Sequence, residues 1–180
     1  MADARLVSPA GAFKDSYRAL VAELAARGEP FVPFPLGFPH ENFEALLAQL
    51  SGCAQGIGIP AGFVPHSTFW LVDGVEVVGV ANLRHRLTDS LRIEGGHIGY
   101  GVRPSARGRG FGTRILALTL PEAASLGIAQ TLVTCAKSNL ASSAVIRANG
   151  GVLQDETFLE TRGEIVQRWW VPTGMAAGAD

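Results

Sequence analysis

A run of alternating glycines, Arg107-Gly108-Arg109-Gly110-Phe111-Gly112-Thr113, stands between a β-rich segment and a segment of helical composition. Glycines permit tight turns because they have no Cβ, and they let neighbouring backbone N–H groups point the same way. The N-terminus of the following helix adds a partial positive charge, and the two arginines add forked donors. The segment therefore predicts a cradle for a phosphate or a pyrophosphate.

Other phosphate-binding motifs match this segment less well. A P-loop needs a lysine after its last glycine, and the segment contains none. A dinucleotide fingerprint needs a longer gap before its third glycine, whereas Gly108, Gly110 and Gly112 alternate with single residues. A glycine-rich turn with its arginines in solvent also matches the segment when it is taken alone.

Hydrophobic periodicity around the run predicts an α/β (α+β) fold, with residues 1–172 as a single domain. Asp73-Gly74 is a strong hairpin-turn signal between two of the strands. Pro121 predicts a bend or a late start in the helix around it. Strands are predicted over 4–8, 67–72, 75–83, 96–102, 130–135, 152–159 and 165–171, and helices over 12–27, 41–50, 110–126 and 140–148. Loops are predicted over 30–39, 51–65 and the basic stretch 84–94, and a disordered tail over 173–180.

Composition excludes several functional classes. A net charge of −1 argues against nucleic-acid binding, although seven of the 15 Lys and Arg residues lie between Arg84 and Arg114. Such a local basic patch suits a small polyanion. The uncharged stretch 45–72 is interrupted by glycines and prolines, so no membrane span is expected. Two cysteines and a charged N-terminus without a signal peptide are typical of a cytoplasmic protein with reduced thiols.

The glycine run resembles the acyl-CoA signature [Q/R]-x-x-G-x-[G/A] of the GCN5-related N-acetyltransferases (GNAT), with Arg107 to Gly112 as the matching residues. The segment from Ile98 to Pro104 is similar to the splayed central strand of that family, and Asn139-Leu140-Ala141-Ser142 is similar to its second cofactor motif. The resemblance covers roughly residues 5–171. It implies a mixed, mostly antiparallel sheet of six to seven strands flanked by about four helices.

The resemblance also implies acetyl-CoA as co-substrate, with no metal, and direct attack of an amine on the thioester. The pyrophosphate is expected on the backbone after Gly110, and the pantetheine is expected along the central strand. Asn139 could also act as a helix cap. The cofactor contacts so implied come from Tyr100, Gly101, Val102, Arg107, Gly108, Arg109, Gly110, Phe111, Gly112, Thr113, Asn139 and Ser142.

The resemblance identifies the catalytic residues less directly than the cofactor contacts. Many family members place a tyrosine, as general acid, at the position of Ile146, so this sequence departs from the pattern. Tyr100 could replace it or could serve only in packing. Glu94 and His97 are the candidate bases, and each could instead be structural.

The acceptor pocket is expected between the aromatic, proline-rich loop, including Phe34, and the stretch 84–94, with Asn82, Arg84 and His85 directed at the substrate. Arginines there would favour an acceptor with a carboxylate or a phosphate. The resemblance thus implies an N-acetyltransferase, which we expect to act on a primary amine of a small molecule, as a monomer or a homodimer. An acyl-CoA-binding or sensing module without turnover is the alternative.

Overall fold

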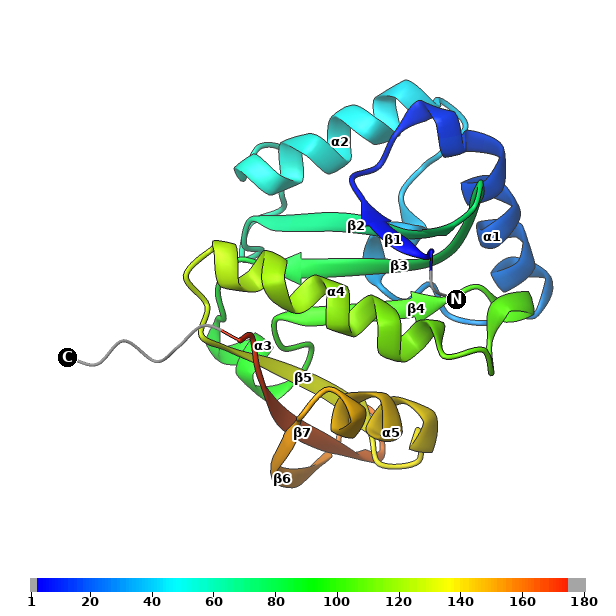
Figure 1. Cartoon of the computed structure of the whole chain (residues 1–180). Helices are drawn as coiled ribbons and strands as arrows, with labels where there is room; N and C mark the ends of the chain where they lie inside the picture. The colour runs from blue at the N-terminus through cyan, green and yellow to red at the C-terminus, as the bar shows by residue number, and fades with distance from the viewer. Residues whose placement is uncertain (1–2, 175–180) are drawn as a thin grey trace.

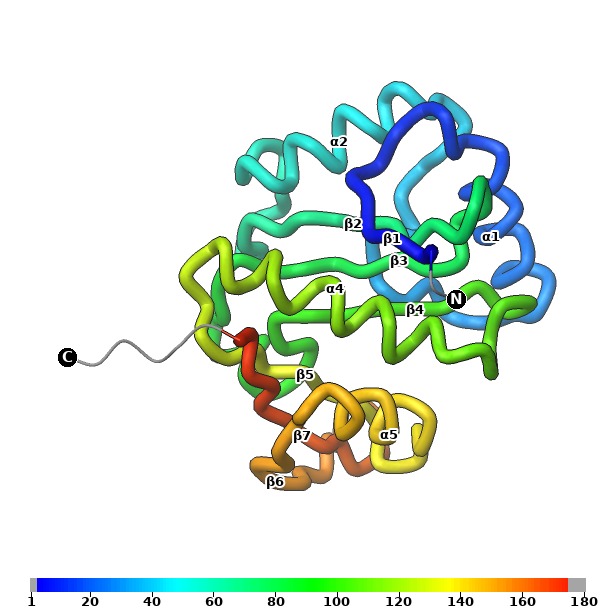
Figure 2. The backbone as a smooth tube through the Cα atoms, in the orientation of Figure 1, coloured from blue at the N-terminus to red at the C-terminus, as the bar shows by residue number. Residues whose placement is uncertain are grey.

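The computed structural model describes residues 3–174, and the elements follow the order expected from the sequence (Figures 1 and 2). The strands are β1 (Arg5–Val7), β2 (His66–Asp73), β3 (Glu76–Arg84), β4 (Ile98–Val102), β5 (Gln130–Ala136), β6 (Val152–Leu159) and β7 (Glu164–Pro172). The helices are α1 (Lys14–Ala26), α2 (Phe43–Gln55), α3 (Asp89–Ile93), α4 (Phe111–Ser125) and α5 (Leu140–Ala148). None of the helices within residues 3–174 is both long and apolar enough to cross a membrane.

The strands form two antiparallel sheets, in the orders β1-β2-β3-β4 and β5-β7-β6. The sheets meet where the His97 N–H donates to the Leu132 carbonyl at 2.7 Å and the Leu132 N–H donates to His97 Nδ1 at 2.9 Å. From this junction β4 and β5 diverge, with α5 beyond the opening (Figure 1). This divergence matches the splayed central strand that the family resemblance implies, and the α+β class is confirmed.

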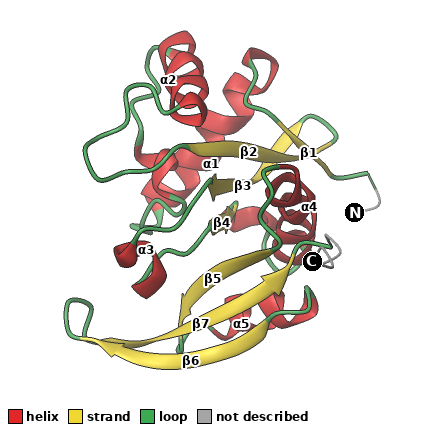
Figure 3. Cartoon of the chain, turned by 90° about the vertical axis from the view of Figure 1, so that its left-hand side faces the viewer, coloured by secondary structure: helices red, strands yellow, loops and turns green. Residues whose placement is uncertain are grey.

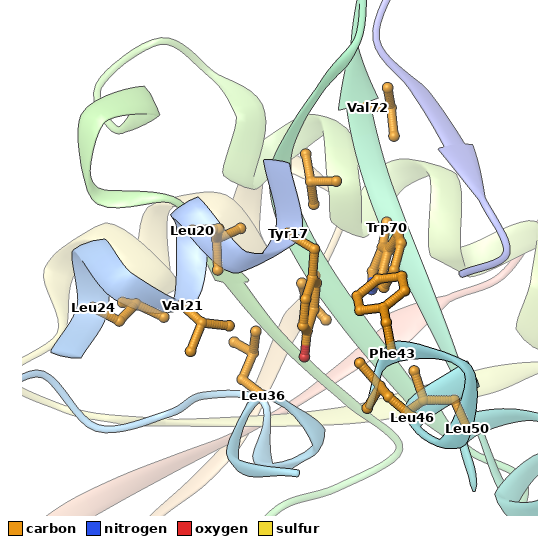
Figure 4. Packing of buried hydrophobic residues seen from close by; sticks show 12 residues of the cluster. Tyr17, Leu20, Val21, Leu24, Leu36, Phe43, Leu46, Leu50, Trp70 and Val72 are labelled. Carbon is orange, nitrogen blue, oxygen red and sulfur yellow. The ribbon is translucent and has the colours of Figure 1, made fainter. Parts of the chain in front are cut away.

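Helices α1 and α2 cover one face of the four-stranded sheet because their apolar residues recur every three or four positions. Tyr17 of α1 stacks on Trp70 of β2 with ring centroids 4.7 Å apart, and Phe43 of α2 lies against both rings (Figure 4). Burying such aromatic side chains contributes a large share of the apolar area removed from water. The cluster fixes β2 and, through it, the neighbouring strand β3.

Helix α4 covers the other face of the four-stranded sheet, and the second sheet with α5 lies past β4, where β5 is the neighbouring strand (Figure 3). Phe111 and Ile115 pack against Leu71 and Ala81 of the sheet. The N-terminus of α4 therefore sits beside the end of β4. The helix runs from Phe111 to Ser125 through Pro121, so its start is not delayed.

Three sequence-based expectations were wrong in part. The stretch 84–94 is not simply an exposed basic loop: it holds α3, whose N-cap Thr88 accepts from the Leu91 N–H at 3.2 Å. Helix α2 continues to Gln55, where Gly56 ends it at φ 76°. Thr173 belongs to the packed structure, since its hydroxyl donates to the Ala129 carbonyl at 2.9 Å. The remainder of the expected tail, 175–180, lies outside the described residues.

Replacing Gly96 by alanine is expected to lower the free energy of unfolding by about 3 kcal/mol. Gly96 has a φ of 58°, and a Cβ there would overlap the Leu132 carbonyl at the junction of the two sheets. Urea denaturation measures the loss. Gly163→Ala is the matched control, because Gly163 has a φ of 64° with nothing within 4 Å of a Cβ. An equal loss in both variants would show that the junction is not the cause.

Candidate functional site

A cleft of about 380 Å³ opens where β4 separates from β5, between the first turns of α4 and α5. Eleven of the twelve residues expected to contact the cofactor line it, and Arg109 does not. The lining comprises Tyr100, Gly101, Val102, Arg107, Gly108, Gly110, Phe111, Gly112, Thr113, Asn139, Ala141, Ser142 and Val145. Residues from three separate stretches of the chain therefore meet in one cavity.

The glycine run gives one end of the cleft a set of free backbone donors. Gly108 and Gly110 have φ values of 73° and 80°, which residues other than glycine rarely adopt. Gly110 is the N-cap of α4 and provides no side-chain cap, and the first helical bond runs from the Arg114 N–H to the Gly110 carbonyl at 3.1 Å. The N–H groups of the first helical turn are thus left without helical acceptors. They form a site suited to an anion.

The two arginines of the run lie differently from the expected arrangement. Arg107 pairs with Glu29 through two hydrogen bonds, of 2.9 and 2.5 Å, and its Nε donates to the Val102 carbonyl at 3.1 Å. This pairing holds the pKa of Glu29 below its ordinary value. Arg109 points away from the cleft, with its guanidinium 4.9 Å from the Phe111 ring centroid and 3.6 Å from Asp73. The arginines shape the loop, and the backbone provides the free donors.

One edge of β4 is open toward the cleft. The Arg103 N–H donates to the Val78 carbonyl and the Arg84 N–H donates to the His97 carbonyl, so odd-numbered residues of this strand face β3. Antiparallel pairing alternates, which turns the backbone of Tyr100 and Val102 toward the opposite edge. A ligand in the cleft can therefore pair with β4 as an additional strand would.

Tyr100 brings a hydroxyl group into the cleft. Its Oη lies 3.0 Å from Oγ of Ser142, at the start of α5. Burial raises the pKa of Tyr100 to about 12, so the phenol is neutral at physiological pH. Asn139 caps α5 by accepting from the Ser142 N–H at 3.0 Å and also lines the cleft, so its two expected roles are compatible. A neutral phenol in this place can donate a proton.

The other candidate catalytic positions face different surroundings. Ile146 is fully buried in the core beside Leu116. Glu94 pairs with Arg162 and lines neither this cleft nor the second cavity described below. His97 is 7% exposed, and its Nδ1 accepts from the Leu132 N–H. Its contacts are those of a residue that joins the two sheets.

The protein is expected to lose stability as the pH falls from about 6.5 to about 4, in part through His97. Burial, and secondarily Arg92 and Arg84, lower the pKa of His97 from 6.5 to about 4. In that window the unfolded chain binds a proton that the folded chain excludes, so the free energy of unfolding falls. Urea midpoints at pH 7.5 and 5 measure the decline. His97→Asn keeps an acceptor but does not titrate, so a decline as steep as in the parent protein would contradict this assignment.

A second cavity, of about 290 Å³, lies at the end of β3. It combines the two expected acceptor residues Phe34 and Arg84 with a segment that sequence reasoning treated only as loop. Its lining comprises Phe34, Gly62, Phe63, Val64, His66, Arg84, Thr88, Ser90 and Leu91. The expected region is thus hollow: five of the nine lining residues come from the two predicted stretches, and Gly62, Phe63, Val64 and His66 were not foreseen.

Asn82 and His85 line neither cavity. Asn82 is fully buried, and its Nδ2 lies 2.9 Å from His66 Nδ1 and 3.2 Å from Thr68 Oγ1. His85 Nε2 lies 2.9 Å from Ser67 Oγ. Both residues therefore support the β2–β3 hairpin around the second cavity and do not face into it.

Comparison with known proteins places the chain in a family. The sequence profile of the acetyltransferase (GNAT) domain matches residues 15–152. The chain belongs to the GNAT family of acetyltransferases. Among curated proteins, none matches the chain at the sequence level.

Solved structures of other GNAT proteins share the fold. An acetyltransferase from Salmonella typhimurium that modifies the N-terminal serine of ribosomal protein L7/L12 has a TM-score of 0.66 at 18% identity, over 93% of both chains. A mutant form of spermidine N-acetyltransferase SpeG from Vibrio cholerae has a TM-score of 0.60 at 16% identity, over 94% of this chain and 95% of its own. The microcin C7 self-immunity acetyltransferase MccE, solved with acetyl-CoA and AMP, has a TM-score of 0.64 at 14% identity, over 93% of this chain and 91% of its own.

Many members of the GNAT family use a tyrosine as the proton donor, so we asked which tyrosine of this chain reaches the cleft. In this GNAT chain the helix position expected to carry a tyrosine holds Ile146, which belongs to the core. Between residues 3 and 174 the only tyrosines are Tyr17 and Tyr100, and Tyr17 is buried against Trp70, away from the cleft. Tyr100 is accordingly the phenol that reaches the cleft.

Proposed function

We propose that this protein is an acetyl-CoA-dependent N-acetyltransferase that transfers an acetyl group to a primary amine of a small molecule. The observation that carries the proposal is the cleft itself. An uncapped helix N-terminus lies at one end and an open strand edge runs along one side. A pyrophosphate and an amide-rich arm are the two parts of coenzyme A that such groups bind.

Each part of the cofactor has chain groups that would hold it. The backbone N–H groups of Phe111, Gly112 and Thr113 would bind the pyrophosphate with the support of the helix dipole. The backbone of Tyr100 and Val102 would pair with the amides of the pantetheine arm. MccE was solved with acetyl-CoA, which supports the same ligand here. When bound, the co-substrate provides the thioester that the amine attacks.

The chain contributes positioning and one proton to this reaction. Holding amine and thioester together converts a bimolecular step into an effectively unimolecular one. As the C–N bond forms and the C–S bond breaks, the Tyr100 hydroxyl donates its proton to the departing sulfur, and the proton that the attacking nitrogen releases returns through water to the Tyr100 phenolate. The high pKa of Tyr100 keeps this proton available at neutral pH. The amine attacks in its neutral form, and because neither cavity is lined by a carboxylate, the ammonium proton is lost to water before the attack.

A small-molecule acceptor suits the second cavity, whose volume is about 290 Å³. Ligand sites for small molecules begin at about this size. Spermidine and a protein N-terminus are the acceptors of two structural neighbours, so amines of different size are compatible with the fold. Cys53 and Cys135 are buried free thiols, which supports a reducing, cytoplasmic setting.

An acyl-CoA-binding module without turnover is the second candidate, and the buried Ile146 at the usual tyrosine position favours it. Thiol release from acetyl-CoA across a panel of amines separates the two. Amine-dependent release supports the enzyme. Thermal stabilisation by acetyl-CoA without release from any amine supports the binding module. A chain that acetyl-CoA does not stabilise, even at about 100 times a micromolar Kd, where about 2.7 kcal/mol is expected, contradicts both.

A further inference from the structure

The second cavity contains a cation with no acidic partner. Arg84, the last residue of β3, lines the cavity, and its Nη1 donates to the carbonyls of Gly95 at 2.8 Å and Gly96 at 3.2 Å. Within residues 3–174 its guanidinium makes no ion pair, and its Nε and Nη2 make no hydrogen bond. The two carbonyls thus fix the orientation of Arg84 and leave one edge of the guanidinium without a partner.

Arg84 is partly exposed, but an unpaired charge is costly to the extent that it is withdrawn from water. Burial lowers the pKa of Arg84, yet a guanidinium stays protonated in proteins. A desolvated cation is stabilised when an anion and further hydrogen bonds pair with it. The Nε–Nη2 edge of a guanidinium presents two parallel donors, which match the two oxygens of a carboxylate or a phosphate. The free edge therefore selects for an oxyanion.

The rest of the cavity wall neither supplies that anion nor competes for it. No aspartate or glutamate is in the lining. Burial lowers the pKa of His66 to about 4, so this imidazole is neutral at pH 7. Phe34 lies under the guanidinium, with 5.8 Å from Cζ to the ring centroid, and Phe63 packs edge-on against Phe34 at 5.6 Å. Thr88 and Ser90 add hydroxyl groups. Apart from Arg84 the wall is uncharged and mostly apolar.

The second cavity and the cofactor cleft lie close together along β4. A Cβ at Gly99 would stand 4.0 Å from Arg84 Nη1, whereas Gly101 lines the cleft. Two residues of strand span about 7 Å. A small molecule held by Arg84 would have to extend its amine over at least this distance and past Val32 and Pro33, which cover Gly101 and Gly99, so several bonds must separate the two groups.

We propose that the acceptor is an amine that also carries an oxyanion, a carboxylate or a phosphate, and that Arg84 binds this group. The inference rests on the proposed function, because it names the substrate class of that reaction. Spermidine is a poor acceptor on this account, since a polycation would place further positive charge against Arg84. This chain therefore differs in acceptor from the neighbour SpeG, which is a spermidine N-acetyltransferase.

Matched pairs of amines test the proposal. Glycine, β-alanine, γ-aminobutyrate and ε-aminocaproate are compared with their carboxamides in acetyl transfer, with aminopropylphosphonate and spermidine as additional arms. At least one acid is expected to exceed its carboxamide about 10- to 100-fold in kcat/KM, the range for hydrogen bonds to a charged group. Comparing kcat/KM for the carboxylic acids with kcat/KM for aminopropylphosphonate shows whether the site prefers a carboxylate or a phosphate-like group. Equal use of every acid and its carboxamide, or a preference for spermidine, overturns the proposal.

Variants locate the effect at Arg84. Arg84→Met is expected to lower kcat/KM for the acid about 10- to 100-fold more than kcat/KM for its carboxamide, and Arg84→Lys is expected to keep part of the preference. Arg86→Ala, at an exposed position outside the lining, is the matched control and should keep the full preference. Equal losses for acid and carboxamide in Arg84→Met would assign Arg84 a structural role and overturn the proposal.

Calorimetry with CoA-loaded protein separates this proposal from the proposed function. If an acid binds at least 10-fold more tightly than its carboxamide but no amine is acetylated, the oxyanion site stands and the enzymatic function fails. If amines are acetylated without any such difference in binding or kcat/KM, the function stands and the oxyanion site is overturned.

Discussion

Thr113→Glu is expected to raise the Kd for acetyl-CoA about 100-fold without weakening the free protein. Thr113 lines the cleft in the first turn of α4, where the pyrophosphate would bind. Two like charges about 6 Å apart, at an effective dielectric constant of about 20, repel by about 2.8 kcal/mol, which corresponds to about 100-fold in Kd. The same carboxylate is favourable to the helix dipole, and no acidic residue occupies the first turn of α4.

The opposite signs of these two effects make the test specific. Calorimetric titration with acetyl-CoA gives the Kd, and the melting temperature without cofactor gives the stability. Thr113→Gln is the control, because it has nearly the same size without the charge and should change the Kd by less than about 5-fold. Unchanged affinity in Thr113→Glu would contradict a pyrophosphate at this helix terminus. A lower melting temperature would assign any weaker binding to damage of the fold.

The parts of the site that sequence reasoning predicted are determined by local chain chemistry. The left-handed conformations of Gly108 and Gly110, and the uncapped start of α4, depend on residues within a few positions of one another. The same holds for the cap that Asn139 provides to α5. The order of strands and helices follows from periodicity, and that order brings the ends of β4, α4 and α5 to one opening.

The parts that sequence reasoning missed depend on distant residues. Arg107 is held by Glu29, and Arg109 is directed toward Asp73, so neither arginine is free in the way that its place in the motif suggests. No local sequence pattern predicts that Glu29 or Asp73 would be the partner. The short helix α3 is similar, because five residues with a Thr88 cap give too little periodicity to predict.

The residues that line the second cavity depend on the register between β2 and β3. His66 lies opposite Arg84 because a bulge between Leu71 and Val72 shifts the β2–β3 pairing by one position. Counting back from the Asp73-Gly74 turn without the bulge would pair His66 with Leu83 and turn side chains to the wrong face. Arg84 was expected near the acceptor and lines the second cavity, but its tether to Gly95 and Gly96 became visible only in the fold.

Tyr100→Phe is expected to lower kcat for acetyl transfer about 100-fold while the Kd for acetyl-CoA changes by less than about 3-fold. A positioned general acid contributes about 100- to 10,000-fold, and water in the cleft can replace part of that effect. The ring of Tyr100 packs beside Leu116 and Phe111, and phenylalanine preserves this packing. Single-turnover kinetics with a good amine acceptor separates the chemical step from product release.

Two further results decide whether Tyr100 acts by proton donation. Burial raises the pKa of Tyr100 to about 12, so the rate of the parent enzyme should show no loss from ionisation of this group below about pH 11. Ser142→Ala removes the hydroxyl 3.0 Å from Tyr100 Oη but leaves the phenol, so it should cost far less than Tyr100→Phe. An acetyl thioester with a more acidic thiol needs less protonation as it leaves, so the deficit of Tyr100→Phe should shrink with it. A deficit of the same size for both thioesters, or a kcat of Tyr100→Phe within about 2-fold of the parent, would show that Tyr100 serves only in packing.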